Sequence, residues 1–168
     1  FLYFSLFFFE GFSYCCRSTG APVYKIEATQ EMRGMAAVGN TLYVAQSPAN
    51  DSAILQFDLC SPKPPVQAPL PTDNLSHPYG LAVSPDNTVL YVTNQDSNAL
   101  VTFNLTTMQE IPNAFPPIEG MRGINVDGAG RVWVNSQGEN ALLLFDGLGA
   151  NLVHRYPIQD PTGVLTVN

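Results

Sequence analysis

Three short runs decide the fold of this chain: Gly34–Val38 (GMAAV), Leu42–Val44 (LYV) and Ile54–Asp58 (ILQFD). The same runs return at Gly80–Val83, Leu90–Val92 and Leu100–Asn104, and again at Gly123–Val126, Val132–Val134 and Leu143–Asp146. The first glycines of successive copies are 46 and 43 residues apart, and Thr162–Val167 opens a fourth copy. Short strands that recur with a period of about 40–50 residues predict an all-β protein, a β-propeller with one blade per copy.

Each copy predicts three inner strands of a four-stranded antiparallel blade. Turn residues separate the runs: Gly39-Asn40 suits a two-residue hairpin, and Ser84–Asn87 places a proline where a type I turn requires its fixed φ. The third run ends on a phenylalanine at a nearly constant offset, and we expect these side chains to fill equivalent gaps between blades. They are Phe57, Phe103 and Phe145. Fainter outer strands are expected at Val66–Leu70, Gln109–Pro112 and Leu152–Tyr156.

The predicted propeller region covers residues 21–168. Its blades are expected at about residues 30–75, 76–118 and 119–160, with a fourth beginning at residue 161. Three blades do not easily close a ring, because closed propellers typically have four to eight. We therefore expect an excerpt of a longer protein, a ring completed by a second copy, or end-to-end stacking into a filament.

The middle copy carries a resemblance to a known repeat. His77–Leu100 (HPYGLAVSPDNTVLYVTNQDSNAL) resembles the YVTN-type propeller repeat, with Tyr91–Asn94 as its core, and is similar to NHL-type repeats. Tyr43–Gln46 and Trp133–Ser136 match more loosely, and the resemblance extends over about residues 30–168. It implies the propeller fold. It does not single out an activity, because such relatives include cell-surface proteins, interaction scaffolds, and lyases or lactonases with a metal in the channel.

The composition favours an extracellular protein. The chain has 14 acidic and 7 basic residues, a net charge of −7, and its basic residues are scattered, which argues against nucleic acid as a partner. Only 12% of its residues are charged. Asn50, Asn74 and Asn104 each begin an N-glycosylation sequon in or beside a predicted turn. We therefore expect a secreted or cell-surface glycoprotein.

Residues 1–20 form an apolar N-terminal segment unlike the rest. Phe1–Phe9 has the length of a signal-peptide hydrophobic region and is too short for a membrane span. The segment is either signal-like or an arm that packs on a blade face or a neighbouring subunit. Cys15, Cys16 and Cys60 are disulfide candidates. Adjacent cysteines rarely pair with each other, and one of the first two could bridge to Cys60. The leftover thiol would stay free or pair between molecules.

Arg33, Tyr79 and Arg122 occupy one equivalent position, a step before the first glycine of each copy. We expect them to converge on the mouth of the propeller channel. The planar arginine fork could bind a carboxylate, a sulfate or a sugar there. The alternative is that each arginine pairs with a local acid, such as Glu31 or Glu119, and only supports the rim.

The sequence predicts no catalytic residues, metal site or cofactor. His77 and His154 are the only histidines and are expected to lie far apart, whereas the lyase relatives need several channel histidines. Lactonase-like relatives use acidic and amide side chains, for which Asn125, Asp127 and Asn135 are possible members, although Asp127-Gly128 fits a turn better. The proline-rich stretch at residues 60–72 is expected to be an extended surface connector, or alternatively a polyproline ligand.

The function expected from these features is a non-catalytic structural or binding module of an extracellular, cell-surface or filamentous assembly. Its partners would be copies of itself or other extracellular proteins, together with N-linked glycans. One alternative is a fragment of a channel-centred propeller hydrolase or lyase. Another is an intracellular protein-interaction scaffold.

Overall fold

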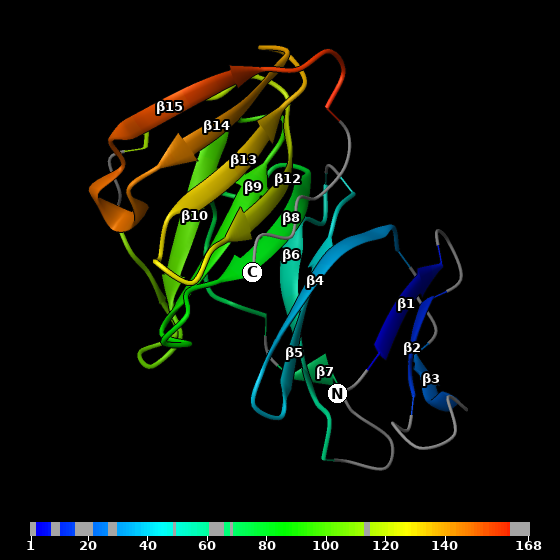
Figure 1. Ribbon diagram of the computed structural model, residues 1–168. Coiled ribbons are helices and arrows are strands. Elements are labelled where there is room, and N and C mark those ends of the chain that lie inside the picture. Colours follow the sequence, from blue (N-terminus) through cyan, green and yellow to red (C-terminus); the bar gives the residue numbers. More distant parts are fainter. Residues whose placement is uncertain are drawn as a thin grey trace.

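The computed structural model describes residues 3–7, 11–15, 22–26, 30–48, 50–60, 66–67, 69–112 and 115–161. The described chain is built of β-strands and one short 3-10 turn, η1 (Gly147–Gly149), as Figure 1 shows. The strands form three four-stranded sheets and one three-stranded sheet, all antiparallel. The all-β prediction is therefore confirmed. No helix in this part of the chain has the length and apolar character needed to cross a membrane.

The three repeats each form one four-stranded sheet, which we call the first, second and third blade. The first blade consists of β4 (Met32–Val38), β5 (Thr41–Gln46), β6 (Ala53–Asp58) and β7 (Val66–Gln67). The second consists of β8 (Pro78–Val83), β9 (Val89–Asn94), β10 (Ala99–Asn104) and β11 (Gln109–Glu110). The third consists of β12 (Met121–Val126), β13 (Val132–Ser136), β14 (Ala141–Phe145) and β15 (Leu152–Pro157). Each strand pairs with the next along the chain, as in a propeller blade.

The fourth sheet comes from the N-terminal part of the chain. It contains β1 (Tyr3–Phe7), β2 (Gly11–Cys15) and β3 (Pro22–Ile26) in that order. Figure 1 places this sheet beside the first blade. The backbone that the structure describes within residues 1–20 thus belongs to β1 and β2.

Two apolar clusters hold the blades together face to face. Tyr43 and Ile54 of the first blade pack with Leu90, Val92 and Phe103 of the second. The cluster between the second and third blades joins Tyr91 and Leu100 to Val132, Val134 and Phe145. Phe57, Phe103 and Phe145 are all fully buried, as their constant offset predicts. This regular stacking gives the three inner strands β4, β8 and β12 a common edge (Figure 1).

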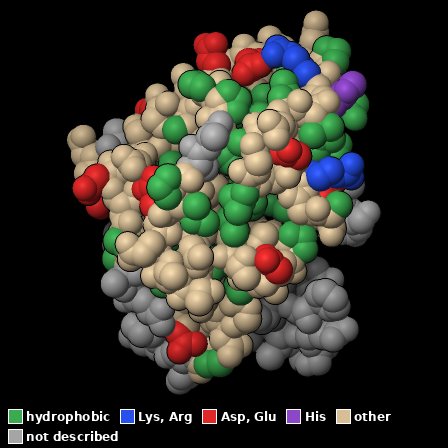
Figure 2. All heavy atoms as spheres, turned by 90° about the vertical axis from the view of Figure 1, so that its left-hand side faces the viewer, with side chains coloured by type: hydrophobic (Ala, Val, Ile, Leu, Met, Phe, Trp, Pro, Cys, Tyr) green, Lys and Arg blue, Asp and Glu red, His purple; other side chains and the backbone are tan. Residues whose placement is uncertain are grey.

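The outer strand of the third blade differs from those of the other two. β15 is six residues long and all six are exposed, whereas β7 and β11 have two residues each. Figure 2 views the molecule from the side of β15 and shows hydrophobic side chains between scattered charges. Leu152 and Val153 are 51% and 55% exposed. The third blade therefore presents an outer strand that carries exposed apolar side chains beside His154 and Arg155.

Candidate functional site

Each inner strand carries a β-bulge at the same position. Arg33–Gly34 in β4 stands opposite the single residue Ala45 of β5. The same two-to-one pairing sets Tyr79–Gly80 of β8 against Thr93, and Arg122–Gly123 of β12 against Asn135. A bulge interrupts the alternation of side chains along a strand and re-aims one of them. The first residue of each pair is therefore free to point to the common edge of the inner strands, which corresponds to the channel wall of a closed propeller.

Gly34 and Gly80 let neighbouring inner strands approach closely. A Cβ atom added at Gly80 would lie 2.5 Å from the carbonyl oxygen of Arg122, and one added at Gly34 would collide with the carbonyl oxygen of Tyr79. Thr93 then joins the second and third blades. Its Oγ1 accepts a hydrogen bond from Gly80 N at 2.8 Å and donates one to the Arg122 carbonyl oxygen at 2.6 Å. These contacts fix the backbone on which Tyr79 and Arg122 stand.

The three predicted site residues lie together. The guanidinium carbon of Arg33 is 4.7 Å from the centre of the Tyr79 ring, and that of Arg122 is 5.7 Å from it. Both distances are within the range of about 6 Å in which a cation is attracted to an aromatic ring. Arg33, Tyr79 and Arg122 therefore form one continuous cluster, which we call the edge cluster, across three blades.

The two arginines of the edge cluster differ in their acidic partners. Arg33 Nη2 lies 2.6 Å from Glu31 Oε1, as the rim-supporting alternative predicts. Arg122 has no acidic partner in the part of the chain that the structure describes. The Glu119 side chain instead lies against Gly138, where its Cγ would be 2.6 Å from an added Cβ. Among the described residues, the cluster therefore keeps one positive charge without an acidic partner, on Arg122.

Arg122 is exceptional among the arginines whose side chains are described. The others pair with carboxylates: Arg33 with Glu31, Arg131 with Asp127, and Arg155 with Glu139. Arg33 Nε and Arg122 Nε are also buried without a hydrogen-bond partner among the described residues. A buried donor without a partner is costly, and native proteins rarely keep one without a reason. A ligand carboxylate that reaches the Arg122 guanidinium would balance its positive charge.

Asp127, a possible lactonase-type residue, anchors a turn instead. Its Oδ1 accepts hydrogen bonds from Ala129 N and Arg131 N, both at 3.0 Å. Its Oδ2 accepts from Arg131 Nε at 2.7 Å and from Trp133 Nε1 at 3.1 Å. Burial opposes ionisation of the carboxyl, but the bonds from Trp133, Arg131 and Ala129 outweigh it and hold the Asp127 pKa below its usual value. The carboxylate is thus fully engaged in the β12–β13 connection.

The two histidines belong to different elements. His77 precedes β8 and pairs through Nδ1 with the Asp96 carboxylate. His154 lies on β15, with its ring centre 4.3 Å from that of Tyr156. Within the described ranges, no group of three or more His, Cys, Asp or Glu side chains is placed to hold a metal ion.

The three sequon asparagines differ in their surroundings. Asn50 is exposed in the connection between β5 and β6. Asn74 is exposed, but its Nδ2 donates to both carboxylate oxygens of Glu110 at 3.0 Å. Asn104 is half-buried at the end of β10, where its Oδ1 accepts from the backbone of Thr106. Asn50 is therefore the asparagine whose amide is best placed for a glycan.

Cys60 is a free, exposed thiol in the structure. Cys16 and the side chain of Cys15 lie outside the described residues, as do residues 61–65 and 68 of the proline-rich stretch. The predicted pairing of Cys60 therefore stays a prediction.

Sequence reasoning missed Thr93. The available signal was its place in Tyr91–Asn94, two residues after the aromatic position that every copy shares. Asn94, the next residue, was missed as well: its Oδ1 accepts from Ser76 N, and its Nδ2 donates to the Asn74 carbonyl oxygen, both at 2.6 Å. The core of the resemblance thus supplies a link between blades and an anchor for the connection that precedes β8.

Comparisons with known proteins agree on the fold. No protein-family model and no curated protein matches the chain. Among solved structures, a nidogen/laminin complex superposes with a TM-score of 0.72 at 14% identity, over 95% of this chain and 63% of that one. Hydrazine synthase of Kuenenia stuttgartiensis gives 0.73 at 15% identity, over 92% and 45%. A gluconolactonase of Xanthomonas campestris, XC5397, gives 0.69 at 17% identity, over 94% and 58%.

The chain has the β-propeller fold. It spans between about half and two thirds of the length of these chains. Identities this low establish the architecture alone, because one propeller scaffold supports unrelated functions. The function must therefore be argued from the edge cluster.

Proposed function

We propose that this chain is a non-catalytic binding module that holds a carboxylate group at its edge cluster. The proposal rests on the surroundings of Arg122. This arginine has no acidic partner in the described chain, and its guanidinium lies beside the Tyr79 ring. An arginine fork matches a carboxylate through two parallel hydrogen bonds. Arg33 adds a second positive charge across the same ring, partly balanced by Glu31.

The rigidity of the edge cluster supports a binding role. Its backbone is fixed by the bulges and by Thr93, which bonds both Gly80 and the Arg122 carbonyl oxygen. Stacking on Tyr79 restricts both guanidinium groups before a ligand arrives. Such preorganisation lowers the entropic cost of binding.

A titration with sodium acetate, followed by amide chemical shifts, tests this proposal. Sodium chloride at equal ionic strength is the reference, because exposed charges are screened by any salt. We expect saturable shifts around Tyr79 and Arg122. Arg122→Gln should weaken acetate binding about tenfold or more, the effect of losing a hydrogen-bonded charge worth about 1.5–3 kcal/mol.

Arg155→Gln is the matched control, because Arg155 lies on the exposed strand β15 and pairs with Glu139. It should leave acetate binding unchanged. Equal binding by the wild type and Arg122→Gln would contradict the proposed site. Hydrolysis of a simple lactone by the purified chain with Ca²⁺ would contradict its non-catalytic character and favour the hydrolase alternative.

We further propose that the module works outside the cell, as a YVTN-type repeat in a glycosylated assembly. The low charge content, the exposed sequon at Asn50 and the likeness to the nidogen/laminin complex structure support this setting. Self-association is supported by the exposed apolar side chains of β15. Light scattering without reducing agent tests it: particles larger than one chain are expected, and a strict monomer at all concentrations would argue against self-association.

A further inference from the structure

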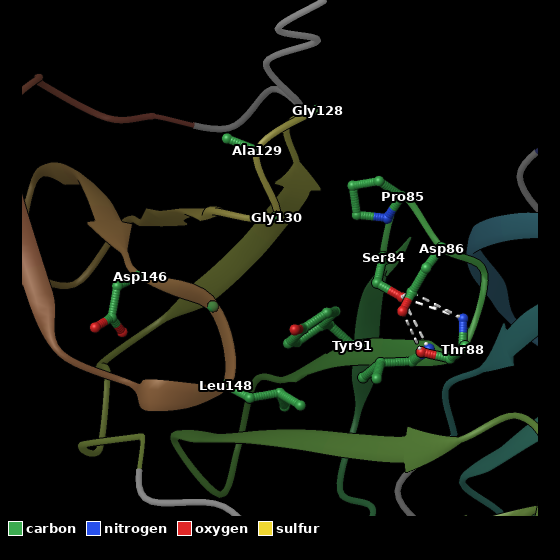
Figure 3. Close-up of a pocket in the computed structure, with 12 residues that line it drawn as sticks. Ser84, Pro85, Asp86, Thr88, Tyr91, Gly128, Ala129, Gly130, Asp146 and Leu148 are labelled. Carbon is green, nitrogen blue, oxygen red and sulfur yellow. Dashed lines mark hydrogen bonds between the residues drawn. The ribbon is translucent and has the colours of Figure 1, made fainter.

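A second site lies between the second and third blades, at the ends of β8 and β12 remote from the edge cluster. It is a pocket of about 400 Å³. Three connections surround it: the β8–β9 turn, the β12–β13 turn and the loop after β14 (Figure 3). Ser84, Pro85 and Asp86 come from the first, Gly128–Gly130 from the second, and Asp146–Leu148 from the third.

Tyr91 lines this pocket with a buried side chain. Only 3% of the residue is exposed, and its ring packs edge-on against Phe115 with centres 6.3 Å apart. Figure 3 shows the Tyr91 side chain between the Ser84–Asp86 turn and Leu148. Its hydroxyl makes no hydrogen bond to any part of the chain that the structure describes. In the next blade, by contrast, Trp133 at the equivalent position donates its Nε1–H to Asp127. Most of the Tyr91 side chain is buried while its hydroxyl opens onto the pocket, where an occupant can form a hydrogen bond with it.

Several backbone and hydroxyl donors of the surrounding turns already serve the turns themselves. In the β8–β9 turn, Thr88 N and Val89 N donate to Ser84 Oγ, and Ser84 Oγ and Thr88 Oγ1 donate to Asp86. In the β12–β13 turn, Ala129 N donates to Asp127. The pocket therefore offers acceptors to an occupant, namely carboxylates and the Tyr91 oxygen.

The charge of the pocket wall is negative. Hydrogen bonds from Ser84 and Thr88 hold the pKa of Asp86 below its usual value, and bonds from Asn151 do the same for Asp146. Both carboxylates are therefore ionised at neutral pH. None of the twelve residues that line the pocket is basic. A positively charged donor is the complement of such a wall.

The remaining wall is apolar. Pro85 and Leu148 both line the pocket, from two different connections, and Leu148 is 46% exposed. These side chains suit a short methylene chain. We propose that the pocket binds a primary alkylammonium group, with its chain between Pro85 and Leu148 and its three N–H donors directed to the Tyr91 oxygen and the Asp86 carboxylate. The group can belong to a free alkylamine or to a lysine side chain of a partner protein, which share this chemistry.

Titrations of the full chain with n-butylammonium chloride and with Nα-acetyl-lysine N-methylamide, followed by amide chemical shifts, test the proposal. Saturable shifts at Gly128, Gly130 and Leu148 are expected for at least one of them. Tighter binding of the lysine derivative identifies a protein lysine as the occupant, and tighter binding of butylammonium identifies a free amine. n-Butanol is the neutral control and should bind at least about tenfold more weakly, since a hydrogen bond to a charged group is worth about 1.5–3 kcal/mol.

Tyr91→Phe keeps the ring and removes the hydroxyl, and should weaken butylammonium binding about tenfold. Tyr43→Phe is the matched control, because Tyr43 holds the equivalent position in the first blade and does not line this pocket. Asp86→Asn, at an exposed position, gives a second variant if Tyr91→Phe fails to fold, and should weaken binding similarly. Binding of butanol as tight as that of butylammonium, or unchanged binding in both Tyr91→Phe and Asp86→Asn, would overturn the proposal.

Discussion

Gly80→Ala tests whether the bulge glycines set the distance between blades. The new Cβ would lie 2.5 Å from the Arg122 carbonyl oxygen, 3.0 Å from Ile124 Cγ2 and 3.1 Å from Thr93 Oγ1. The nearest of these atoms belongs to the backbone of β12 and cannot rotate away, so β8 and β12 must move apart. Overpacking of this kind costs about 1–3 kcal/mol, and disturbing the Thr93 bridge costs about 1 kcal/mol more. The expected loss is therefore about 2–4 kcal/mol of the roughly 5–15 kcal/mol by which domains are stable.

Urea unfolding followed by circular dichroism measures this loss, together with thermal unfolding, in which Tm should fall by roughly 5–15 °C. Gly128→Ala is the matched control, because a Cβ at Gly128 meets no atom within 4 Å. It should change the free energy of unfolding by less than about 0.5 kcal/mol. If Gly80→Ala is no less stable than Gly128→Ala, the close approach of β8 and β12 does not hold the blades as described.

Thr93→Val should lower the free energy of unfolding by about 1–3 kcal/mol, because it leaves the buried Gly80 N–H without its acceptor; unchanged urea unfolding would show that the bridge is dispensable. Asp127 has a lowered pKa, so its carboxylate stabilises the fold above the ordinary aspartate pKa of about 3.9, and this stability is lost as pH falls through the lowered value. Asp127→Asn should therefore be less stable than the wild type at pH 7 and lose less stability between pH 5 and 2; a parallel pH profile would argue against this assignment. Asn50→Gln should remove one glycan when the chain is secreted from a eukaryotic host, as read by mass spectrometry with and without glycosidase; an identical mass for the two chains would show that Asn50 is not modified.

The repeat pattern predicted the inner strands closely because blades impose the same demands on each copy, whereas the outer strand expected at Gln109–Pro112 is shorter, β11 at Gln109–Glu110. The outer strand expected at Leu152–Tyr156 is β15, Leu152–Pro157, and the turn expected at Ser84–Asn87 closes with a 2.9 Å bond from Asn87 N to the Ser84 carbonyl oxygen. The equivalence of Arg33, Tyr79 and Arg122 was also visible. This equivalence could be predicted because each of the three residues comes directly before the first glycine of its copy.

The stacking of the edge cluster could not be predicted, because it depends on how far apart neighbouring blades stand. That distance is set by Gly34 and Gly80, whose importance appears only when another backbone lies against them. The sequence also does not show which glutamate pairs with which arginine. Glu31 pairs with Arg33, whereas Glu119, at a similar sequence distance from Arg122, lies over Gly138. The Tyr91 pocket could not be predicted from the sequence either, because its walls come from three separate connections.

The bulges have a consequence for how this scaffold can change. In a regular strand every second side chain belongs to the packed face, so a substitution usually alters the core. Each bulge supplies one additional position that lies outside this alternation, and the following glycine keeps the strands in place. Arg, Tyr and Arg already occupy these positions in three otherwise similar blades. Mutation or design can therefore change the chemistry of this edge one blade at a time, by changing three residues and retaining the glycines behind them.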